Sequence, residues 1–325
     1  MSGVRIIGTG LSIPEKILSN ADLEKIVDTS DEWIRTRTGI AERRIADSDT
    51  ASSDMAYDAS LKALKACSVY PEDIDAIIVA TVTSDYPFPS TACLIQSRLG
   101  AKRAFAFDVS AGCTGFIYAL KVGKAMIDAG DAETILLVGA ETLSRVVDYE
   151  DRATCILFGD GAGAVVLKES DIPGILSVSL GSDGNAWQLL YMPGGGSRIP
   201  ASEESVKARH HYLKMEGSEV FKEAVKAMES ASIEAIRRAD ITPDEIDLFI
   251  SHQANYRIME AVRRRLDIPP EKVFMNVDRY GNTSSASVPI ALDEAVRSGK
   301  IHRGDIILFS AFGAGFTWGS AVVKW

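Results

Sequence analysis

Cys113 lies in the stretch DVSAGCTGFIYAL, residues 108–120, where an apolar run ends and a helical pattern begins. A free thiol has a pKa of about 8.5, so only a few per cent of it is thiolate at neutral pH. A helix N-terminus lowers this pKa, because its unpaired N–H groups and positive dipole charge favour the anion. The preceding glycine permits a tight turn, and the mostly apolar segment FIYALKVGKAMI predicts a buried helix that fixes the sulfur. The pattern indicates a nucleophile, with a structural cysteine as the alternative for Cys113 alone.

The elements that position this residue belong to a unit that the chain contains twice. Residues 59–79, ASLKALKACSVYPEDIDAIIV, align without gaps to residues 231–251, ASIEAIRRADITPDEIDLFIS. Each copy predicts an amphipathic helix, a turn that begins at proline and a short strand buried on both faces. Later in each half a second strand, TILLVGA or IILFSA, leads into a glycine-rich hairpin. We therefore expect a duplicated α/β fold.

Two further polar side chains stand at matching places in the two copies. By the alignment, His252 falls at the carboxyl end of a buried strand, the edge at which parallel α/β sheets bind ligands. GCT (112–114) and GNT (281–283) both close a turn before a helical pattern, so Cys113 and Asn282 are expected to be equivalent. Alone, the histidine would more often be a core residue with its hydrogen bonds satisfied, and the asparagine could simply be a turn residue. Together with the cysteine, they indicate an active site at this edge.

Composition and charge exclude several classes of protein. The formal net charge of -10 argues against nucleic acid as the main partner, because phosphate binding needs a basic face. No run approaches the roughly 18 apolar residues of a membrane span and no leader opens the chain, so we expect a cytoplasmic protein without membrane contact. The four cysteines are too widely spaced for a disulfide framework or a zinc site, and no metal is expected. Gly159, Gly161 and Gly163 precede a strand, which favours a hairpin over a dinucleotide loop.

The sequence resembles the 3-oxoacyl-(acyl carrier protein) synthase III family of the thiolase-fold superfamily over its whole length. The stretches that carry the resemblance are WIRTRTGI (33–40), DVSAGCTGF (108–116), ILFGDGAGA (156–164), SHQANYRI (251–258), RYGNTSSAS (279–287) and FGAGFTWGSA (312–321). The resemblance implies a thiolase-like duplicated fold, with two pseudo-twofold-related α/β halves and mixed sheets in an αβαβα layered arrangement. Residues 1–170 would form the half with the cysteine, and residues 171–325 the half with the histidine and asparagine. It also implies a homodimer and no cofactor.

The family's chemistry gives each of the three residues a role. The resemblance implies that Cys113 takes an acyl group from a short acyl-CoA and releases CoA. Malonyl carrier protein then binds, and His252 and Asn282 hydrogen-bond its thioester oxygen while CO2 leaves and the enolate attacks the acyl-enzyme. The backbone N–H groups of Cys113 and Ala314 would form the oxyanion hole, although the family often has glycine at the second position. The product would be a 3-oxoacyl carrier protein, formed in the first condensation of type II fatty acid synthesis.

The resemblance also implies a path for CoA. Trp33 would stack on its adenine, and Arg37 and Arg152 would meet its polar end. The ordinary alternatives are a buried anchor for the tryptophan and a solvated surface for the arginines. The pantetheine arm would follow positions that a helical core also explains, namely Gly217, Phe221, Ala254 and Asn255.

Two surfaces for partner proteins follow from the same resemblance. Phe88 would reach across the dimer interface and cap the acyl pocket of the partner. Arg257 and Arg264 lie seven residues apart on a predicted helix and so share a face, which makes a basic island on an acidic chain. A solvated helix face is the alternative there. The acidic carrier protein is expected to dock on Gln253, Ala254, Asn255, Tyr256, Arg257, Arg264, Arg265 and Lys222.

Other functions fit parts of the same pattern. A related CoA-ester condensing enzyme of secondary metabolism, or one that uses longer or branched primers, would keep all the residues named above. A cysteine acyl hydrolase or a plain acyltransferase would use the nucleophile without condensation. A degenerate scaffold of an assembly line is disfavoured by the presence of cysteine, histidine and asparagine together.

Overall fold

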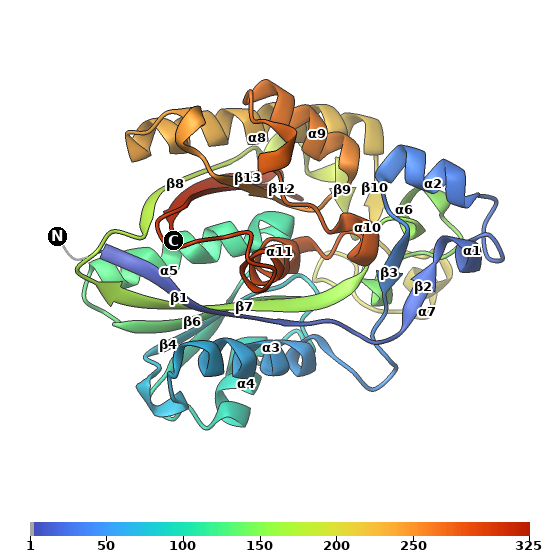
Figure 1. Cartoon of the computed structure of the whole chain (residues 1–325). Helices are drawn as coiled ribbons and strands as arrows, with labels where there is room; N and C mark the ends of the chain where they lie inside the picture. Colours follow the sequence, from blue (N-terminus) through green and yellow to red (C-terminus); the bar gives the residue numbers. More distant parts are fainter. Residues whose placement is uncertain (1–2) are drawn as a thin grey trace.

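The computed structural model describes residues 3–325, and two mixed β-sheets form its framework (Figure 1). The first sheet contains five strands, in the order β1 (Gly3–Ser12), β7 (Asp160–Ser170), β6 (Thr134–Thr142), β4 (Ala76–Ala80) and β5 (Phe105–Val109). In this sheet β4 is parallel to both of its neighbours, whereas β7 is antiparallel to both of its own. β4 is buried along its whole length, as the run of β-branched and small residues predicts.

The second sheet contains four strands, in the order β11 (Leu248–Ser251), β12 (Ile306–Gly313), β13 (Thr317–Lys324) and β8 (Ile175–Ser182). Only the pair β11 and β12 is parallel among these strands. The strand order of the second sheet matches that of the first, with β8, β13, β12 and β11 in the places of β1, β7, β6 and β4. The counterpart of β5 is reduced to a single parallel bridge between Phe249 and Val273.

Helices lie between and outside the two sheets and complete five layers (Figure 1). α5 (Gly115–Asp128) and α11 (Ser287–Arg297) lie between the sheets, where one apolar cluster joins them to strands of both. α3 (Ser52–Cys67) and α4 (Thr91–Leu99) cover the outer face of the first sheet. α8 (Gly217–Ala239) and α9 (Tyr256–Arg265) cover the outer face of the second. The chain therefore has the predicted αβαβα arrangement, and α5 is buried because a sheet lies on each side of it.

The predicted repeat is confirmed in the structure. In the first half α3 leads through a 3-10 turn at Pro71–Asp73 into β4. In the second half α8 leads through a 3-10 turn at Pro243–Glu245 into β11.

The predicted equivalence of Cys113 and Asn282 is wrong by three residues. A 3-10 turn at Gly112–Thr114 precedes α5, and one at Ser284–Ala286 precedes α11. The first residue of each turn has a left-handed backbone, with φ of 55° at Gly112 and 49° at Ser284. This register matches Cys113 with Ser285 and leaves Asn282 two residues before the second turn. The shared pattern of glycine, any residue and threonine does not mark equivalent positions. GCT (112–114) forms the first turn itself, whereas GNT (281–283) precedes the second turn.

The glycine-rich stretch at 159–167 lies mostly within β7, which agrees with its assignment to a sheet instead of a dinucleotide loop. It is not itself a hairpin, because the connection from β6 contains α6 (Arg152–Cys155) and a 3-10 turn at Leu143–Arg145. A Cβ atom on Gly163 would lie 2.6 Å from the backbone nitrogen of Ile290, so glycine allows α11 to pack directly on β7. The second stretch does form a hairpin, with β12 and β13 joined by residues 314–316.

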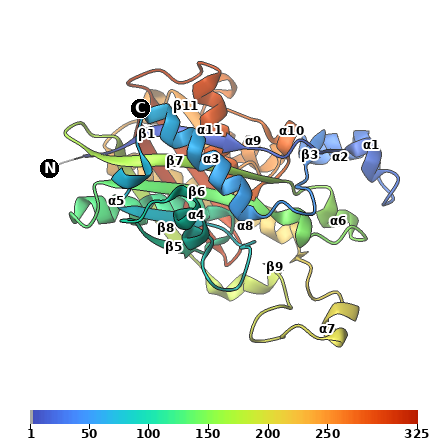
Figure 2. The same cartoon turned by 90° about the horizontal axis from the view of Figure 1, so that it is seen from below.

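The remaining elements are short, and most lie at one end of the layers (Figure 1). They are β2 (Ile17–Ser19), α1 (Asn20–Leu23), α2 (Asp31–Thr38), β3 (Glu42–Arg44), α10 (Val277–Tyr280) and a 3-10 turn at Pro270–Lys272. A longer segment extends from the body, as Figure 2 shows, and contains a 3-10 turn at Gly184–Leu189, β9 (Leu190–Tyr191), α7 (Glu203–Lys207) and β10 (Lys214–Met215). Within residues 3–325, no helix is long and apolar enough to cross a membrane, and no cluster of three or more His, Cys, Asp or Glu could hold a metal ion.

Candidate active site

A cavity of about 840 Å³ receives residues from both halves of the chain. Its lining is mainly apolar, and it includes all three of the residues singled out in the sequence, Cys113, His252 and Asn282. Trp33, which is partly exposed, and Arg37, which is exposed, line the same cavity. The cavity therefore connects the three polar side chains to the surface. An enclosed apolar space with a few polar groups is the usual form of a small-molecule site.

The turn that carries Cys113 packs directly against the hairpin between β12 and β13. A Cβ atom on Gly112 would lie 2.7 Å from the backbone nitrogen of Ala314, so only glycine fits this left-handed position. Thr317 holds the two segments together, because its hydroxyl donates a hydrogen bond of 2.8 Å to the carbonyl oxygen of Ala111. Within residues 3–325, neither Cys113 N nor Ala314 N donates a hydrogen bond to another protein group. Two backbone donors of neighbouring segments are therefore available beside the thiol.

The alanine at position 314, a departure from the family pattern, fits its place without difficulty. Ala314 does not have a left-handed backbone, which is the conformation in which a side chain would be strained. Its Cβ atom therefore leaves the orientation of its N–H group unaffected.

The pKa of the Cys113 thiol differs from the expectation based on its position. Burial raises this pKa to about 12, the nearby Ser284 side chain lowers it, and the carboxylate of Glu141 raises it. The helix N-terminus favours the thiolate, but desolvation penalises it more strongly here. The resting thiol is consequently protonated at neutral pH, and its proton has to move to another group when the sulfur attacks.

His252 follows β11 directly and is 2% exposed. Its Nδ1 lies 2.7 Å from the hydroxyl of Ser287, which also accepts the backbone N–H of Gln253 at 3.3 Å. Among the described residues that hydroxyl has no other acceptor, so we assign its proton to Nδ1, which leaves Nε2 as the protonated nitrogen. Burial lowers the pKa of His252 to about 3, so the ring is neutral. A neutral imidazole with its N–H in the cavity donates a hydrogen bond and is a weak base.

Asn282 is held by both halves of the protein. Its backbone N–H donates to Leu157 and its carbonyl oxygen accepts from Gly159, with distances of 2.8 and 3.0 Å. Its side-chain oxygen accepts the N–H of Ser284 at 2.9 Å, so the amide NH2 is the part left to bind a ligand. The cavity thus contains a thiol and two neutral N–H donors. This set can bind a carbonyl oxygen that gains negative charge.

Comparison with known proteins agrees with this geometry. The family model of 3-oxoacyl-[acyl-carrier-protein] synthase III matches residues 107–184, and the model of its C-terminal part matches residues 236–325. The beta-ketoacyl-[acyl-carrier-protein] synthase III of Caldanaerobacter subterraneus subsp. tengcongensis is 58% identical over 98% of this chain and 97% of its own. The chain belongs to the 3-oxoacyl-[acyl-carrier-protein] synthase III family. The enzyme of that name from Xanthomonas campestris is 54% identical over 99% of this chain and 98% of its own.

Solved structures of the synthase III family have the same fold. The crystal structure of 3-oxoacyl-[acyl-carrier-protein] synthase III from Aquifex aeolicus VF5 superposes with a TM-score of 0.92 and 49% identity. The match covers 99% of this chain and 100% of that one. The thiolase-like arrangement predicted from the sequence is therefore that of the family.

The residues predicted to bind CoA lie along the cavity, with one exception. Gly217, Phe221, Ala254 and Asn255 line it, as do Trp33 and Arg37. Arg152 is not part of the lining but lies next to it, with its guanidinium 5.0 Å from the centre of the Trp33 ring. The Arg37 guanidinium lies 5.4 Å from the same ring, so one aromatic side chain holds two cations at the mouth of the cavity.

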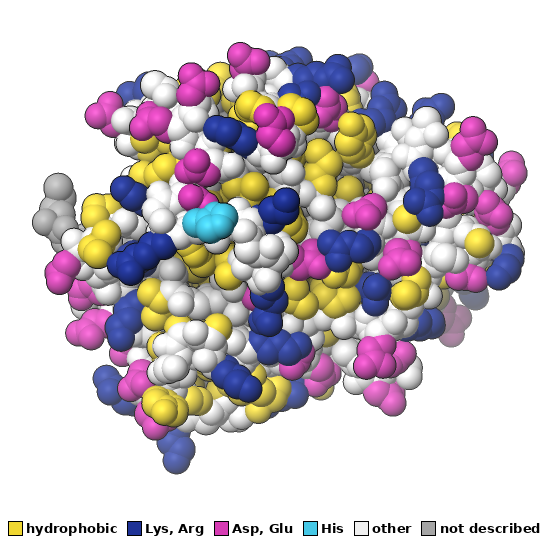
Figure 3. All heavy atoms as spheres, viewed as in Figure 1, with side chains coloured by type: hydrophobic (Ala, Val, Ile, Leu, Met, Phe, Trp, Pro, Cys, Tyr) yellow, Lys and Arg dark blue, Asp and Glu magenta, His cyan; other side chains and the backbone are white. Residues whose placement is uncertain are grey.

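The basic residues predicted to bind the carrier protein differ in their surroundings. Three of them form ion pairs. Arg264 pairs with Glu260 and Arg265 with Glu229, both at 2.6 Å, and Lys222 pairs with Glu219 at 2.8 Å. Figure 3 accordingly shows acidic and basic side chains intermixed over α8 and α9. Among the described residues Arg257 forms no ion pair; it is exposed, lines the cavity mouth and lies 5.7 Å from the Phe221 ring. The predicted basic island is therefore partly neutralised, since Glu260 also pairs with Arg263, and Arg257 keeps its charge beside the cavity.

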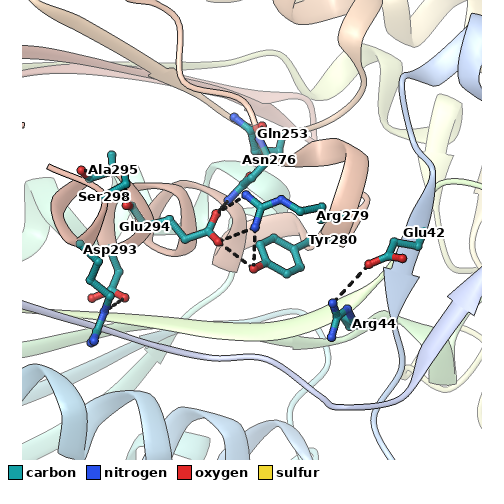
Figure 4. A network of polar contacts seen from close by, with 11 residues as sticks. Glu42, Arg44, Gln253, Asn276, Arg279, Tyr280, Asp293, Glu294, Ala295 and Ser298 are labelled. Atoms are coloured by element: carbon teal, nitrogen blue, oxygen red, sulfur yellow. Dashed lines mark hydrogen bonds and ion pairs between the residues drawn. The ribbon is translucent and has the colours of Figure 1, made fainter. Parts of the chain in front are cut away.

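The prediction that Gln253 contacts the carrier is corrected by its burial. Gln253 is 1% exposed, and its side chain donates to Ser251 O and accepts the N–H of Asn276 at 3.0 Å. Asn276 in turn donates to Glu294, so Gln253 belongs to a polar network inside the protein (Figure 4). By contrast, its neighbour Tyr256 is exposed at the start of α9 and remains accessible to a partner.

Phe88 is 85% exposed and does not line the cavity of its own chain. Val82 and Tyr86, in the same connection between β4 and α4, are exposed as well. This chain therefore presents several apolar side chains on one segment, an uncommon arrangement for a surface that faces only water.

The sequence analysis missed a group of buried polar residues beneath the thiol. They are Glu141 at the end of β6, Thr81 and Thr83 after β4, and Ser284, Ser285 and Ser287 around the start of α11. The pattern was visible as a glutamate that follows the apolar strand TILLVGA and as the hydroxyl-rich run TSSAS. Both features are equally typical of the end of a strand and the start of a helix, so neither one marks a functional group by itself.

Proposed function

We propose that this protein catalyses the condensation of a short acyl-CoA with malonyl carrier protein to give a 3-oxoacyl carrier protein, CoA and CO2. One observation carries the proposal: a partly buried thiol shares an apolar cavity with two neutral N–H donors. The names of the relatives, which are synthases acting on acyl carrier protein, support it.

In the first half-reaction, the Cys113 sulfur attacks the thioester carbon of acyl-CoA. Negative charge develops on the carbonyl oxygen, and the N–H groups of Cys113 and Ala314 stabilise it because no other group of residues 3–325 accepts them. The carbon–sulfur bond to CoA then breaks, and the acyl group stays on Cys113. The gap between the two backbone segments is closed so tightly that a Cβ on Gly313 would lie 2.5 Å from Cys113 N, which fixes these donors.

In the second half-reaction, malonyl carrier protein supplies the carbon nucleophile. His252 Nε2 and the Asn282 amide donate hydrogen bonds to the malonyl thioester oxygen, and the bond to the carboxylate breaks with release of CO2. The electron pair of that bond becomes an enolate, which attacks the acyl-enzyme and frees Cys113. Neither side chain acts as a base, which fits a histidine whose pKa is lowered to about 3 by burial.

The same lowered pKa argues against an acyl hydrolase. Hydrolysis of an acyl-enzyme needs a general base that takes a proton from water, and an efficient base has a pKa near the working pH. His252 is far from this condition, and the apolar lining of the cavity disfavours water. Condensation needs no such base, because decarboxylation generates the nucleophile.

The substrate path and the partners belong to the proposal. We assign the CoA end to Trp33, Arg37 and Arg152, and the carrier protein to Arg257 and Tyr256 at the mouth of the cavity. A second copy of the chain would cover the exposed apolar segment that contains Phe88, which supports a homodimer. A cytoplasmic location stays a prediction.

Intact-mass spectrometry tests the function directly. After incubation with acetyl-CoA the protein should gain one acetyl group, on the peptide that contains Cys113, and malonyl carrier protein should remove it with release of CO2. The variant C113A should gain none. An adduct on Cys67, Cys93 or Cys155, or loss of the acetyl group to water at the same rate without carrier protein, would refute the proposal.

A further inference from the structure

Glu141 is a completely buried carboxyl group that the reaction described above does not use. It ends β6 in the first half of the chain and is 0% exposed. Its oxygens accept hydrogen bonds from the hydroxyl of Thr83 at 2.6 Å and from the backbone N–H of Val82 at 3.1 Å. Burial of a carboxylate costs free energy unless the group is hydrogen-bonded and paired with a cation, and among the described residues Glu141 forms no ion pair. Glu141 therefore calls for an explanation.

Two serines of the second half connect Glu141 to the region of the thiol. Ser284 and Ser285 donate to the same carboxylate oxygen, at 3.1 and 2.7 Å. Ser285 has the carbonyl oxygen of Ala80 as another acceptor, at 2.8 Å, whereas Ser284 lines the same cavity as Cys113 and its side chain lowers the pKa of that thiol. The turns that carry Ser284 and Cys113 pack against each other, so the Ser284 hydroxyl lies beside the thiol while it donates its proton to the carboxylate.

The backbone of Ser284 is an independent sign that its side chain has a task. Its φ of 49° lies in the left-handed region, which is unfavourable for a residue with a Cβ atom. The equivalent position in the first half is Gly112, with φ of 55°, where glycine has no such cost. Strain that a glycine would remove commonly persists where a side chain is functional.

We propose that Glu141 is a positioning residue for Cys113. Glu141 holds the proton of the thiol, received through Ser284, while the sulfur attacks acyl-CoA. The Cys113 proton passes to the Ser284 oxygen as the Ser284 proton passes to Glu141. The sulfur forms its bond to the acyl carbon, and the bond to the CoA sulfur breaks. The same proton then returns through Ser284 to the departing sulfur, which leaves as a thiol. The proposal rests on the function proposed above.

Conservation of buried charge lowers the cost of this transfer. A thiolate beside an ionised Glu141 would place two negative charges in one buried region, and burial raises the pKa of both groups. Transfer of the proton from sulfur to carboxylate leaves one negative charge before and after, so no second charge is desolvated. The titratable partner that Glu141 affects is Cys113, and its hydrogen-bond partners among the described residues are the uncharged groups of Val82, two threonines (Thr81 and Thr83) and the two serines.

His252 is a less suitable acceptor for the proton. Its Nδ1 is occupied by the hydroxyl of Ser287, and its Nε2 already carries a hydrogen in the tautomer that this contact selects. A proton on the ring would create a buried cation, which the lowered pKa opposes. Glu141 is then the group that can take the proton without this cost.

The test separates the two half-reactions in E141Q and S284G. Glutamine keeps the size of the side chain but cannot take the proton, and glycine suits the left-handed backbone while it removes the hydroxyl. For each variant, rapid-quench mass spectrometry gives the rate of Cys113 acylation by acetyl-CoA. The rate of condensation is measured separately on enzyme that has been acetylated to completion by long incubation.

We expect each variant to acylate about 10²-fold more slowly than wild type, the usual effect of a lost proton acceptor, and to keep most of its condensation rate. The double variant should lose little more than either single one, because both changes interrupt one path. In wild type the acylation rate should vary little with pH between about 6 and 9, whereas in E141Q it should rise roughly tenfold per pH unit, because the proton then goes to solvent.

D160N serves as the matched control. Asp160 is also a 0% exposed carboxylate with backbone and serine donors, but its partners Ser144 and Ala46 do not line the cavity that contains the thiol. Its variant should keep the wild-type ratio of the two half-reactions and the wild-type pH dependence. Equal losses in both half-reactions of E141Q, or an unchanged pH slope, would make Glu141 a structural group only. If wild type forms no acyl-enzyme, the proposed function fails instead.

Discussion

The Nδ1 atom of His252 lies 2.7 Å from the hydroxyl of Ser287, the first residue of α11. Because Ser287 Oγ has no other acceptor among the described residues, we assign its proton to the ring nitrogen, which keeps the hydrogen of His252 on Nε2. A residue of the central helix layer thus decides which nitrogen of the histidine meets the substrate. This contact separates the two half-reactions, since only the second one is proposed to use His252.

S287A should therefore lower the rate of CO2 release from malonyl carrier protein by about tenfold. The change leaves a buried nitrogen without its partner, at a cost of about 1–3 kcal/mol, and allows the tautomer with hydrogen on Nδ1. Acylation by acetyl-CoA should be nearly unchanged. S298A removes a serine at the exposed end of the same helix and should affect neither rate. A tenfold loss of acylation in S287A would count against this role.

N282D should reduce CO2 release by about 10²–10³, the usual effect of losing one donor to an oxyanion. Aspartate keeps the oxygen that accepts the N–H of Ser284 but cannot donate to the thioester oxygen. Formation of the acetyl-enzyme should remain largely intact, because the backbone N–H groups of Cys113 and Ala314 serve that step. The two rates are measured on the same preparation, by intact mass and by trapped CO2. Parallel losses in both would reject the division of labour.

The buried His252 should make the free energy of unfolding depend on pH. Its pKa is lowered from 6.5 to about 3 in the folded protein, so the unfolded chain binds the proton first as the pH falls. Its contribution to stability is present above about pH 6.5 and is lost between there and about pH 3, at up to about 1.4 kcal/mol per pH unit.

Urea unfolding of wild type and H252Q at a series of pH values isolates this contribution as the difference between two curves. The difference should shrink as the pH falls below about 6.5. H302Q, which changes a histidine whose side chain is 77% exposed, should follow the wild-type curve. A constant offset between wild type and H252Q over this range would show that His252 binds its proton equally in both states.

The helices and strands of the repeated unit could be predicted from the sequence, because the pattern of each element depends on residues that are close together in the chain. The helix, proline turn and buried strand recur in both halves, and the periodicity of residues 59–79 and 231–251 was sufficient to find them. Placement of Cys113 and His252 at one site followed from the repeat. The equivalence of Cys113 with Asn282 failed, because the chain register before α11 depends on the left-handed residue Ser284, and no sequence pattern marks a serine for that conformation.

The electrostatic properties of the site could not be predicted in the same way. The pKa of Cys113 depends on burial and on Glu141, which is 28 residues away in the sequence and reaches it through a serine of the other half. Likewise, Arg265 looked like a free cation on its helix, but Glu229 of α8 pairs with it. Both effects arise from contacts between distant segments, which helical spacing alone does not reveal.

The contrast between Arg257 and Arg264 yields a prediction about the carrier protein. Arg257 lies at the cavity mouth and has no acidic partner among the described residues, whereas Arg264 is seven residues further along α9 and pairs with Glu260. Charges at the rim of an interface act mainly on association and are screened by salt. R257E should therefore raise the KM for malonyl carrier protein by about tenfold and flatten its dependence on salt, with little effect on kcat.

R264E is the matched control, because it reverses a charge on the same helix whose field the neighbouring Glu260 already offsets. It should raise this KM by a smaller factor than R257E. Acetylation of Cys113 by acetyl-CoA should stay within about twofold of wild type in both variants, since that step needs no acidic protein partner. Steady-state kinetics at low and high salt gives the KM values, and rapid-quench mass spectrometry gives the acetylation rate. If R264E proved as harmful as R257E, the carrier would bind along the whole face of α9; if neither changed the KM, it would dock elsewhere.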